Sequence, residues 1–110
     1  MNDTNVIREL AGVIDQRKGQ SEEGSYTCYL FEKGTDKILK KCGEECAEMI
    51  IAAKNDSKEE LAGEIADLVY HVLVLMKDRE VPVDLVEAVL RERSQKMGNL
   101  KTFHQVDKNT

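Results

Sequence analysis

The segment from Ser57 to Arg79 is apolar around most of its circumference when it is drawn as an α-helix, and this pattern constrains the fold more than any other. A helix that is apolar nearly all round is normally buried. Its remaining strip carries Glu64, Asp67 and His71, because a spacing of seven residues returns to nearly the same angle. Buried carboxylates without partners are costly, so this helix needs a neighbour that compensates their charge.

A second acidic cluster runs from Glu44 to Glu48, and fifteen residues separate Glu48 from Glu64. This cluster also lies in a segment with a helical apolar period. Residues three and four apart lie on one face of a helix, so Glu44, Glu45 and Glu48 share an arc. Like charges packed in this way repel each other. A hard divalent cation with oxygen ligands is the economical compensation.

Helical periodicity dominates the rest of the chain, and no segment alternates convincingly as a strand. We therefore expect an all-α bundle of four to five helices. A chain of 110 residues forms one domain with a core of moderate size, and we expect homodimerisation to complete that core. The expected helices are Thr4–Arg17, a short segment Tyr26–Glu32 ending near Gly34, a helix from Thr35 or Asp36 to Lys54, Ser57–Arg79 and Pro82–Lys96, with residues 1–97 as the domain and 98–110 as a flexible tail.

Local signals mark where the long helices start. Thr35 or Asp36 can cap the helix that leads to Lys54. Ser57 and Glu60 form a capping-box signature for the next helix, and Pro82 suits the first turn of the last one. The stripes expected to be buried are Val6, Ile7, Leu10, Val13 and Ile14 in the first helix, and Leu39, Cys42, Cys46, Met49, Ile50 and Ala53 in the helix to Lys54.

Two glycines, Gly43 and Gly63, each precede an acidic cluster in the middle of a helix. Glycine in such a position costs roughly 1 kcal/mol relative to alanine. Close approach of two helices and room for a ligand explain this cost equally well.

The composition excludes several classes of protein. Sixteen Lys and Arg against 21 Asp and Glu give a formal net charge of −5, and a nucleic-acid partner would need a basic stripe instead. There is no signal-peptide pattern and no apolar run long enough to cross a bilayer, so we expect no membrane partner and a soluble cytoplasmic protein. The three cysteines do not form a disulfide framework, and Cys42 and Cys46 are expected to be small core residues rather than metal thiolates.

Four or five carboxylates on two packed helices can hold one or more Mg²⁺ ions. Mg²⁺ keeps several waters and prefers substrate phosphates as its remaining ligands, so it would neutralise a polyphosphate and activate a water. A carboxylate outside the metal site could take the proton from that water. A di-iron bundle would use Glu-x-x-His, whereas His71 is seven residues from Glu64, and oxygen ligation favours Mg²⁺ or Mn²⁺ over iron. A solvated acidic face and a structural role for His71 are the simpler alternatives.

Lys37 and Lys41 continue the acidic face toward the N-terminus of the second long helix, and Asn55 falls seven residues after Glu48 on the same line. Ordinary Lys–Glu pairing along a helix is the alternative, and each such pair contributes only about 0.2–0.5 kcal/mol. The line as a whole is better explained as a surface that faces a substrate with phosphates.

These residues resemble those of the phosphoribosyl-ATP pyrophosphatases of histidine biosynthesis, which belong to an all-α nucleotide pyrophosphatase superfamily with MazG-like and dimeric dUTPase-type enzymes. The superfamily pattern of Glu-x-x-Glu, a spacer and Glu-x-x-Asp is matched by Glu45, Glu48, Glu64 and Asp67. The resemblance covers about Val6 to Lys77, and its narrower motifs are Ser25-Tyr26-Thr27, Gly34, Asp36-Lys37-Ile38, Lys41, Gly43-Glu44-Glu45, Ala52-Ala53-Lys54-Asn55, Asp67-Leu68-Val69-Tyr70-His71 and Val74-Leu75.

The resemblance implies hydrolysis of the bond between the α- and β-phosphates of phosphoribosyl-ATP, which gives phosphoribosyl-AMP and pyrophosphate in the second step of histidine biosynthesis. It also implies a Mg²⁺ requirement and a homodimer, or a higher assembly, whose interface helps to build each site. By this resemblance Glu45, Glu48, Glu64 and Asp67 ligate Mg²⁺, and Glu44 is a further ligand or the base that activates water. The implied substrate contacts are Lys37, Lys41, Lys54 and Asn55 to phosphates or ribose, with Tyr26 and Thr27 positioning the substrate.

Two alternatives stay open at this point. A house-cleaning pyrophosphatase for canonical or damaged nucleoside triphosphates would share the fold and the metal site but would recognise a different base and ribose. A helical dimerisation module with an acidic surface would have no catalytic activity. In such a module Glu48→Gln and Asp67→Asn would leave stability equal or improved, whereas in an enzyme they would abolish turnover with the dimer intact.

Overall fold

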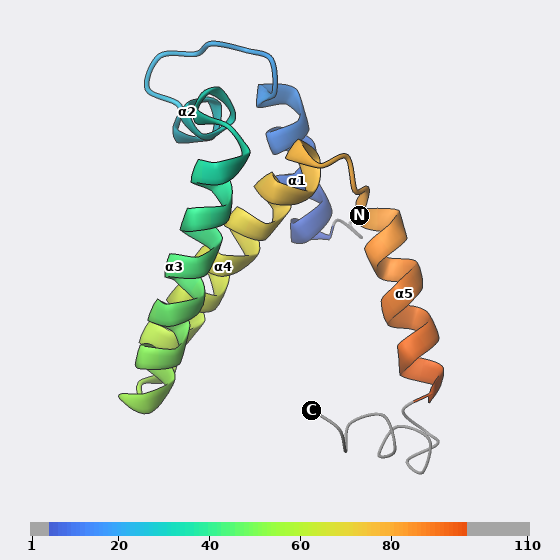
Figure 1. Cartoon of the computed structure of the whole chain (residues 1–110). Coiled ribbons are helices and arrows are strands. Elements are labelled where there is room, and N and C mark those ends of the chain that lie inside the picture. Colours follow the sequence, from blue (N-terminus) through green and yellow to red (C-terminus); the bar gives the residue numbers. More distant parts are fainter. Residues whose placement is uncertain (1–4, 97–110) are drawn as a thin grey trace. The chain divides into compact units, whose positions relative to one another are not determined.

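The computed structural model describes residues 5–96, and all the regular secondary structure in this range is helical (Figure 1). The prediction of an all-α protein with four to five helices is therefore confirmed. Thr4 and the tail predicted at 98–110 lie outside the described residues. The helices are α1 (Val6–Arg17), α2 (Tyr26–Lys33), α3 (Thr35–Lys54), α4 (Lys58–Asp78) and α5 (Val83–Lys96).

The chain divides into two compact units between Glu80 and Val81. The first unit holds α1 to α4 and the second holds α5, and each is described by itself. The expectation of one domain over residues 1–97 stays a prediction.

In the first unit, α3 and α4 form an antiparallel hairpin and lie side by side (Figure 1). The connection is short because Asp56 takes a left-handed conformation, with φ of 61°, which aspartate tolerates in turns. Ser57 then caps α4, as predicted, by accepting a hydrogen bond of 3.2 Å from the main-chain N–H of Glu60. The hairpin therefore brings the middle of α3 opposite the first turns of α4.

The start of α3 differs from the prediction. Gly34, and neither Thr35 nor Asp36, occupies the N-cap position of α3, and it makes no side-chain cap. Its φ of 97° lies in a region that only glycine adopts readily, and this conformation ends α2 and begins α3 at one residue. The Thr35 hydroxyl donates instead to the carboxylate of Asp78 at the last residue of α4, at 2.6 Å.

The remaining helices of this unit cover the end of the hairpin away from its turn. There α1 packs on α4 and α2 packs on α3. An ion pair between Lys77 and Asp15 also joins α4 to α1. The buried residues are Ile14, Cys28, Leu30, Ile38, Ala52, Leu73 and Val74, together with the polar residues Glu45 and His71.

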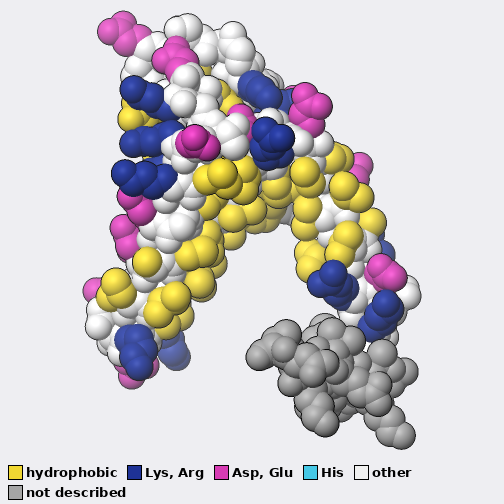
Figure 2. Space-filling model, viewed as in Figure 1, with side chains coloured by type: hydrophobic (Ala, Val, Ile, Leu, Met, Phe, Trp, Pro, Cys, Tyr) yellow, Lys and Arg dark blue, Asp and Glu magenta, His cyan; other side chains and the backbone are white. Residues whose placement is uncertain are grey.

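Much of the apolar surface expected in the core is exposed in the single chain. The buried line of α3 is Ile38, Glu45 and Ala52, spaced by seven residues, whereas Leu39 and Ile50 are 49% and 59% exposed. The prediction of which face of α3 is buried was therefore wrong, because apolar periodicity does not say which of two faces meets α4. The other members of the predicted stripes that are exposed are Val6, Ile7, Val13, Cys46 and Ala53. Figure 2 shows hydrophobic side chains gathered along the exposed side of the hairpin.

Among residues 5–96, Gly43 and Gly63 do not mark a close approach of helices. A Cβ atom added at either position would have no atom of another element within 4 Å. Of the two explanations from the sequence, a close approach of helices is therefore not seen in the described range, and room for a ligand stays a prediction.

In the second unit, Pro82 directly precedes α5, and its carbonyl accepts a hydrogen bond of 3.0 Å from Leu85. This confirms the start predicted from proline. No described residue of α5 is buried, and Leu85 and Leu90 are more than half exposed. None of the helices in the described range is long and apolar enough to cross a membrane.

Candidate active site

Three carboxylates from α3 and α4, the two helices of the hairpin, converge on one point. Glu45 and Glu48 come from successive turns of α3, and Glu64 comes from the second turn of α4. One oxygen of each lies within 4.8 Å of the others. These are three of the four carboxylates in the Glu-x-x-Glu and Glu-x-x-Asp pattern, and they meet because α3 and α4 pair as an antiparallel hairpin.

Two oxygens in this group are buried without a hydrogen-bond donor. Glu45 is only 7% exposed, and its Oε1 atom finds no partner among the described residues; the same holds for Oε1 of Glu64. An ionised carboxylate can only accept hydrogen bonds, so a buried oxygen without a donor is unfavourable. A cation at this point would satisfy both oxygens, and an all-oxygen set suits Mg²⁺ or Mn²⁺.

The electrostatics of the group agree with this interpretation. The pKa of Glu64 is raised above its ordinary value of 4.5, first by burial, then by the hydrogen bond and charge of Glu48, and further by the charges of Asp67 and Glu45. A raised carboxyl pKa means that the folded protein disfavours the charged form. A bound divalent cation would reverse this effect, because it stabilises the ionised carboxylates.

Asp67 lies outside the group of three in this structure. It is exposed, one turn beyond Glu64 on α4, and its charge raises the pKa of Glu64. Its main-chain oxygen accepts a hydrogen bond from the imidazole of His71 at 2.8 Å. A role for the Asp67 carboxylate as a metal ligand stays a prediction.

Glu44 and Lys41 form an ion pair beside the group of three. Lys41 Nζ lies 3.2 Å from Glu44 Oε1, and this contact is the main reason that the pKa of Lys41 is raised. Lys37 lies one turn earlier, with Nζ 5.9 Å from the centre of the Tyr29 ring. Figure 2 shows Lys and Arg side chains along the upper part of α3 and acidic side chains below them. The helix thus presents positive charge next to the acidic group.

Lys54 and Asn55 are exposed at the opposite end of α3. With a rise of 1.5 Å per residue, they lie roughly 10 Å along the helix from Glu48. The structure therefore does not gather them with Lys37 and Lys41, which lie on the other side of the acidic group. Their contact with a substrate stays a prediction.

Tyr26 and Thr27, at the start of α2, are both hydrogen-bonded to α4. The Tyr26 hydroxyl lies 3.0 Å from His71 Nε2, and the hydroxyls of Thr27 and Tyr70 share a hydrogen bond of 2.5 Å. Burial is the main reason that the pKa of Tyr26 is raised. Tyr70 was not among the residues predicted for the site, although it stands next to His71 in the Asp67-Leu68-Val69-Tyr70-His71 motif.

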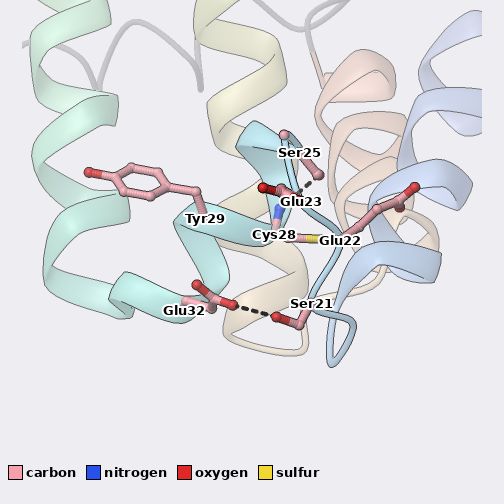
Figure 3. Close-up of a pocket in the computed structure, with 8 residues that line it drawn as sticks. Ser21, Glu22, Glu23, Ser25, Cys28, Tyr29 and Glu32 are labelled. Carbon is pink, nitrogen blue, oxygen red and sulfur yellow. Dashed lines mark hydrogen bonds between the residues drawn. The ribbon is translucent and has the colours of Figure 1, made fainter.

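A pocket of about 310 Å³ lies elsewhere, between α2 and the loop that precedes it (Figure 3). Two of its carboxylates have partners: Glu22 pairs with Arg17 at 3.2 Å, and Ser21 donates to Glu32 at 3.1 Å. It contains none of the residues predicted for the site. The acidic group on α3 and α4, rather than this pocket, is the candidate active site.

The fold and this group together define a class, an all-α protein with a carboxylate cluster suited to a hard divalent cation. The chain belongs to the phosphoribosyl-ATP pyrophosphohydrolase family, whose profile matches residues 7–94. It is 54% identical to the phosphoribosyl-ATP pyrophosphatase of Clostridium botulinum (strain Kyoto / Type A2) over 101 residues, which cover 92% of both chains. It is 50% identical to the phosphoribosyl-ATP pyrophosphatase of Clostridium novyi over the same shares. It also matches 42% of the histidine biosynthesis bifunctional protein of Bacillus subtilis, at 53% identity over 88 residues that cover 80% of this chain.

Proposed function

We propose that this chain hydrolyses phosphoribosyl-ATP to phosphoribosyl-AMP and pyrophosphate in histidine biosynthesis, with Mg²⁺ as cofactor. It is an enzyme with the phosphoribosyl-ATP pyrophosphatase activity of the family to which it belongs. The observation that supports the metal-dependent mechanism best is the pair of buried carboxylate oxygens, Oε1 of Glu45 and Oε1 of Glu64, that lack a donor among the described residues.

Glu45, Glu48 and Glu64 would hold the metal, and Asp67 would join them as the fourth carboxylate of the superfamily pattern. Bound there, Mg²⁺ supplies positive charge for the polyphosphate and lowers the pKa of a bound water. Side chains of the protein would carry out the proton transfer and bind the substrate.

Glu44 is the proposed base or further ligand, because it lies beside the metal group. There its carboxylate pairs with Lys41. A water oxygen adds to phosphorus, its proton passes to a carboxylate, and the bond from that phosphorus to the α–β bridging oxygen breaks. Lys37 and Lys41 would bind phosphates on the N-terminal side of the acidic group, and Lys54 and Asn55 would contact phosphates or ribose at the other end. Tyr26 and Thr27 would position the substrate.

A homodimer, or a higher assembly, is part of this proposal. Ile50 and Ile51 are each 59% exposed on α3, and Ile65 is 42% exposed on α4, close in sequence to the metal group. Exposed apolar surface of this kind marks an interaction site. We propose that a second copy covers it, that the protein works in the cytoplasm, and that nucleic acids and membranes are not its partners.

The dimer can be tested separately from the chemistry. Ile50→Glu would place a charge in the proposed interface, so sedimentation should show a smaller species than the wild type. Lys58→Glu, an exposed change at the start of α4, is the matched control and should leave the assembly unchanged. If both variants sediment like the wild type, Ile50 lies outside any interface.

The activity is tested by pyrophosphate release from phosphoribosyl-ATP with Mg²⁺, with and without a chelator. We expect release that stops when the chelator is added. Canonical nucleoside triphosphates should be poor substrates, and a clear preference for dCTP or dUTP would favour the house-cleaning pyrophosphatase instead. Glu48→Gln should lower turnover by about 100-fold or more while the assembly stays intact, which a non-catalytic dimerisation module does not predict.

A further inference from the structure

His71 is the second buried polar residue of the core, and both of its ring nitrogens are engaged. It is 6% exposed, and Nδ1 lies 2.8 Å from the main-chain oxygen of Asp67. A carbonyl oxygen only accepts hydrogen bonds, so Nδ1 must carry the proton. In the neutral ring Nε2 then has a lone pair, and the Tyr26 hydroxyl at 3.0 Å must donate to it.

The surroundings hold the imidazole in this orientation. Its ring packs edge-on against Tyr26, with centres 5.7 Å apart, and against Tyr70, with centres 4.9 Å apart. The Cys42 thiol donates to the main-chain oxygen of His71 at 3.5 Å, which joins α3 to the same turn of α4. Neither the metal group nor the acid–base chemistry uses this histidine.

The tautomer determines what Tyr26 can offer to a ligand. A tyrosine hydroxyl has one proton, and here that proton points toward His71, so the lone pairs of the oxygen remain to accept. The side chain is 43% exposed. Burial is the main cause of the raised pKa of this hydroxyl, and the charges of Lys41 and Glu45 act on the same pKa in opposite directions.

We propose that His71 is a positioning residue that commits the Tyr26 proton, so that Tyr26 accepts a hydrogen bond from a sugar hydroxyl of the substrate and does not bind a phosphate. Phosphate oxygens only accept and would find no donor at this point, whereas a ribose hydroxyl can donate. The inference rests on the proposed function, because it takes the substrate to be the nucleotide phosphoribosyl-ATP. It assigns phosphate binding to the lysines and ribose recognition to Tyr26.

The tautomer can be tested without any substrate. Two-bond ¹H–¹⁵N correlation spectra distinguish a ring protonated on Nδ1 from one protonated on Nε2. The chain has two histidines, so loss of one set of signals in His71→Gln assigns those of His71. We expect the Nδ1–H form in the wild type, and a shift of the Nε2 signal in Tyr26→Phe. An Nε2–H or doubly protonated ring at neutral pH would overturn the inference.

The contact with the substrate is tested by coupling a protein change to a substrate change. KM and kcat are measured for the wild type and for Tyr26→Phe. The substrates are phosphoribosyl-ATP and analogues that each lack one ribose hydroxyl. Loss of a neutral hydrogen bond should raise KM by about three- to tenfold, with kcat changed by less than about twofold. One analogue should show the same loss with the wild type and no further loss with Tyr26→Phe. Tyr29→Phe, a matched change on the same helix, should behave as the wild type.

The part played by His71 is tested by a rescue. His71→Leu should raise KM to a similar extent, and His71→Gln, which keeps an acceptor for Tyr26, should recover most of the loss; circular dichroism reports whether each variant folds. If Tyr26→Phe weakens every analogue as much as the parent substrate, the inference is wrong while the proposed function stands. If the wild type does not turn over phosphoribosyl-ATP at all, the proposed function fails and the inference fails with it.

Discussion

Thr35 and Asp78 tie the open end of the helical hairpin together. Thr35 is the first residue of α3 and Asp78 the last of α4, and the hydroxyl of one donates to the carboxylate of the other at 2.6 Å. The turn after Asn55 holds the opposite end. With both ends held, the register of the two helices places Glu48 beside Glu64.

Removing the hydrogen bond between Thr35 and Asp78 should lower the stability of the first unit. A hydrogen bond to a charged group contributes about 1.5–3 kcal/mol, so Thr35→Val should lower the free energy of unfolding by about that amount in urea titrations. Thr35→Ser keeps the hydroxyl and should lose much less. Equal stability of the two variants would show that the hydroxyl does not hold the hairpin.

Magnesium should stabilise the wild type through the three carboxylates. At a concentration 100 times its dissociation constant, a ligand that binds only the folded state adds about 2.7 kcal/mol. Glu48→Gln should lose most of this gain and should lower turnover by about 100-fold or more, since even outer partners of metal ligands contribute about 10–100-fold. Thermal unfolding with and without Mg²⁺ measures the first effect.

The control for this prediction is Glu59→Gln, which removes an exposed carboxylate from the first turn of α4. It should respond to Mg²⁺ as the wild type does. A wild type whose unfolding temperature ignores Mg²⁺ would argue against a cation among Glu45, Glu48 and Glu64.

The raised pKa of Glu64 predicts how stability depends on pH when a chelator is present. Between the ordinary value of 4.5 and the higher value in the fold, the folded protein binds more protons than the unfolded chain. The contribution of Glu64 is therefore fully present below about pH 4.5 and is lost as the pH rises through the folded pKa. Urea titrations at several pH values give the free energy of unfolding, and its change with pH in this range should differ between the wild type and Glu64→Gln. Parallel curves would contradict the prediction, and saturating Mg²⁺ should abolish the difference.

Gly43→Ala should affect the stability of α3 and the activity of the enzyme in opposite directions. A Cβ atom there meets nothing within 4 Å in the part of the chain that the structure describes, so the variant should stabilise α3 by about 1 kcal/mol. Turnover should nevertheless fall if the space beside Glu44 holds a substrate or a second copy. Gly12→Ala in α1 also meets nothing and should be stabilised with turnover unchanged. Full activity in both variants would show that the space at Gly43 is unused.

The local elements of this fold could be predicted from the sequence because their signals act locally. The Ser57 cap, the start of α5 directly after Pro82 and the placement of Glu45 and Glu48 on successive turns of α3 each depend on a few neighbouring residues. Family resemblance added the reaction and the substrate, which neither periodicity nor composition encodes. The dimer, the part of Asp67 and the substrate contacts stay predictions.

Which side chains of each helix face its neighbours was decided only by the tertiary structure. Periodicity gives the angle of each side chain around its own helix, but not the rotation of one helix against another. That rotation buries Ile38, Glu45 and Ala52 and leaves Leu39 and Ile50 exposed. It also gives Thr35 a partner in Asp78 and turns His71 toward Tyr26. Both hydrogen bonds join residues more than forty positions apart, and they form only when α2, α3 and α4 pack together.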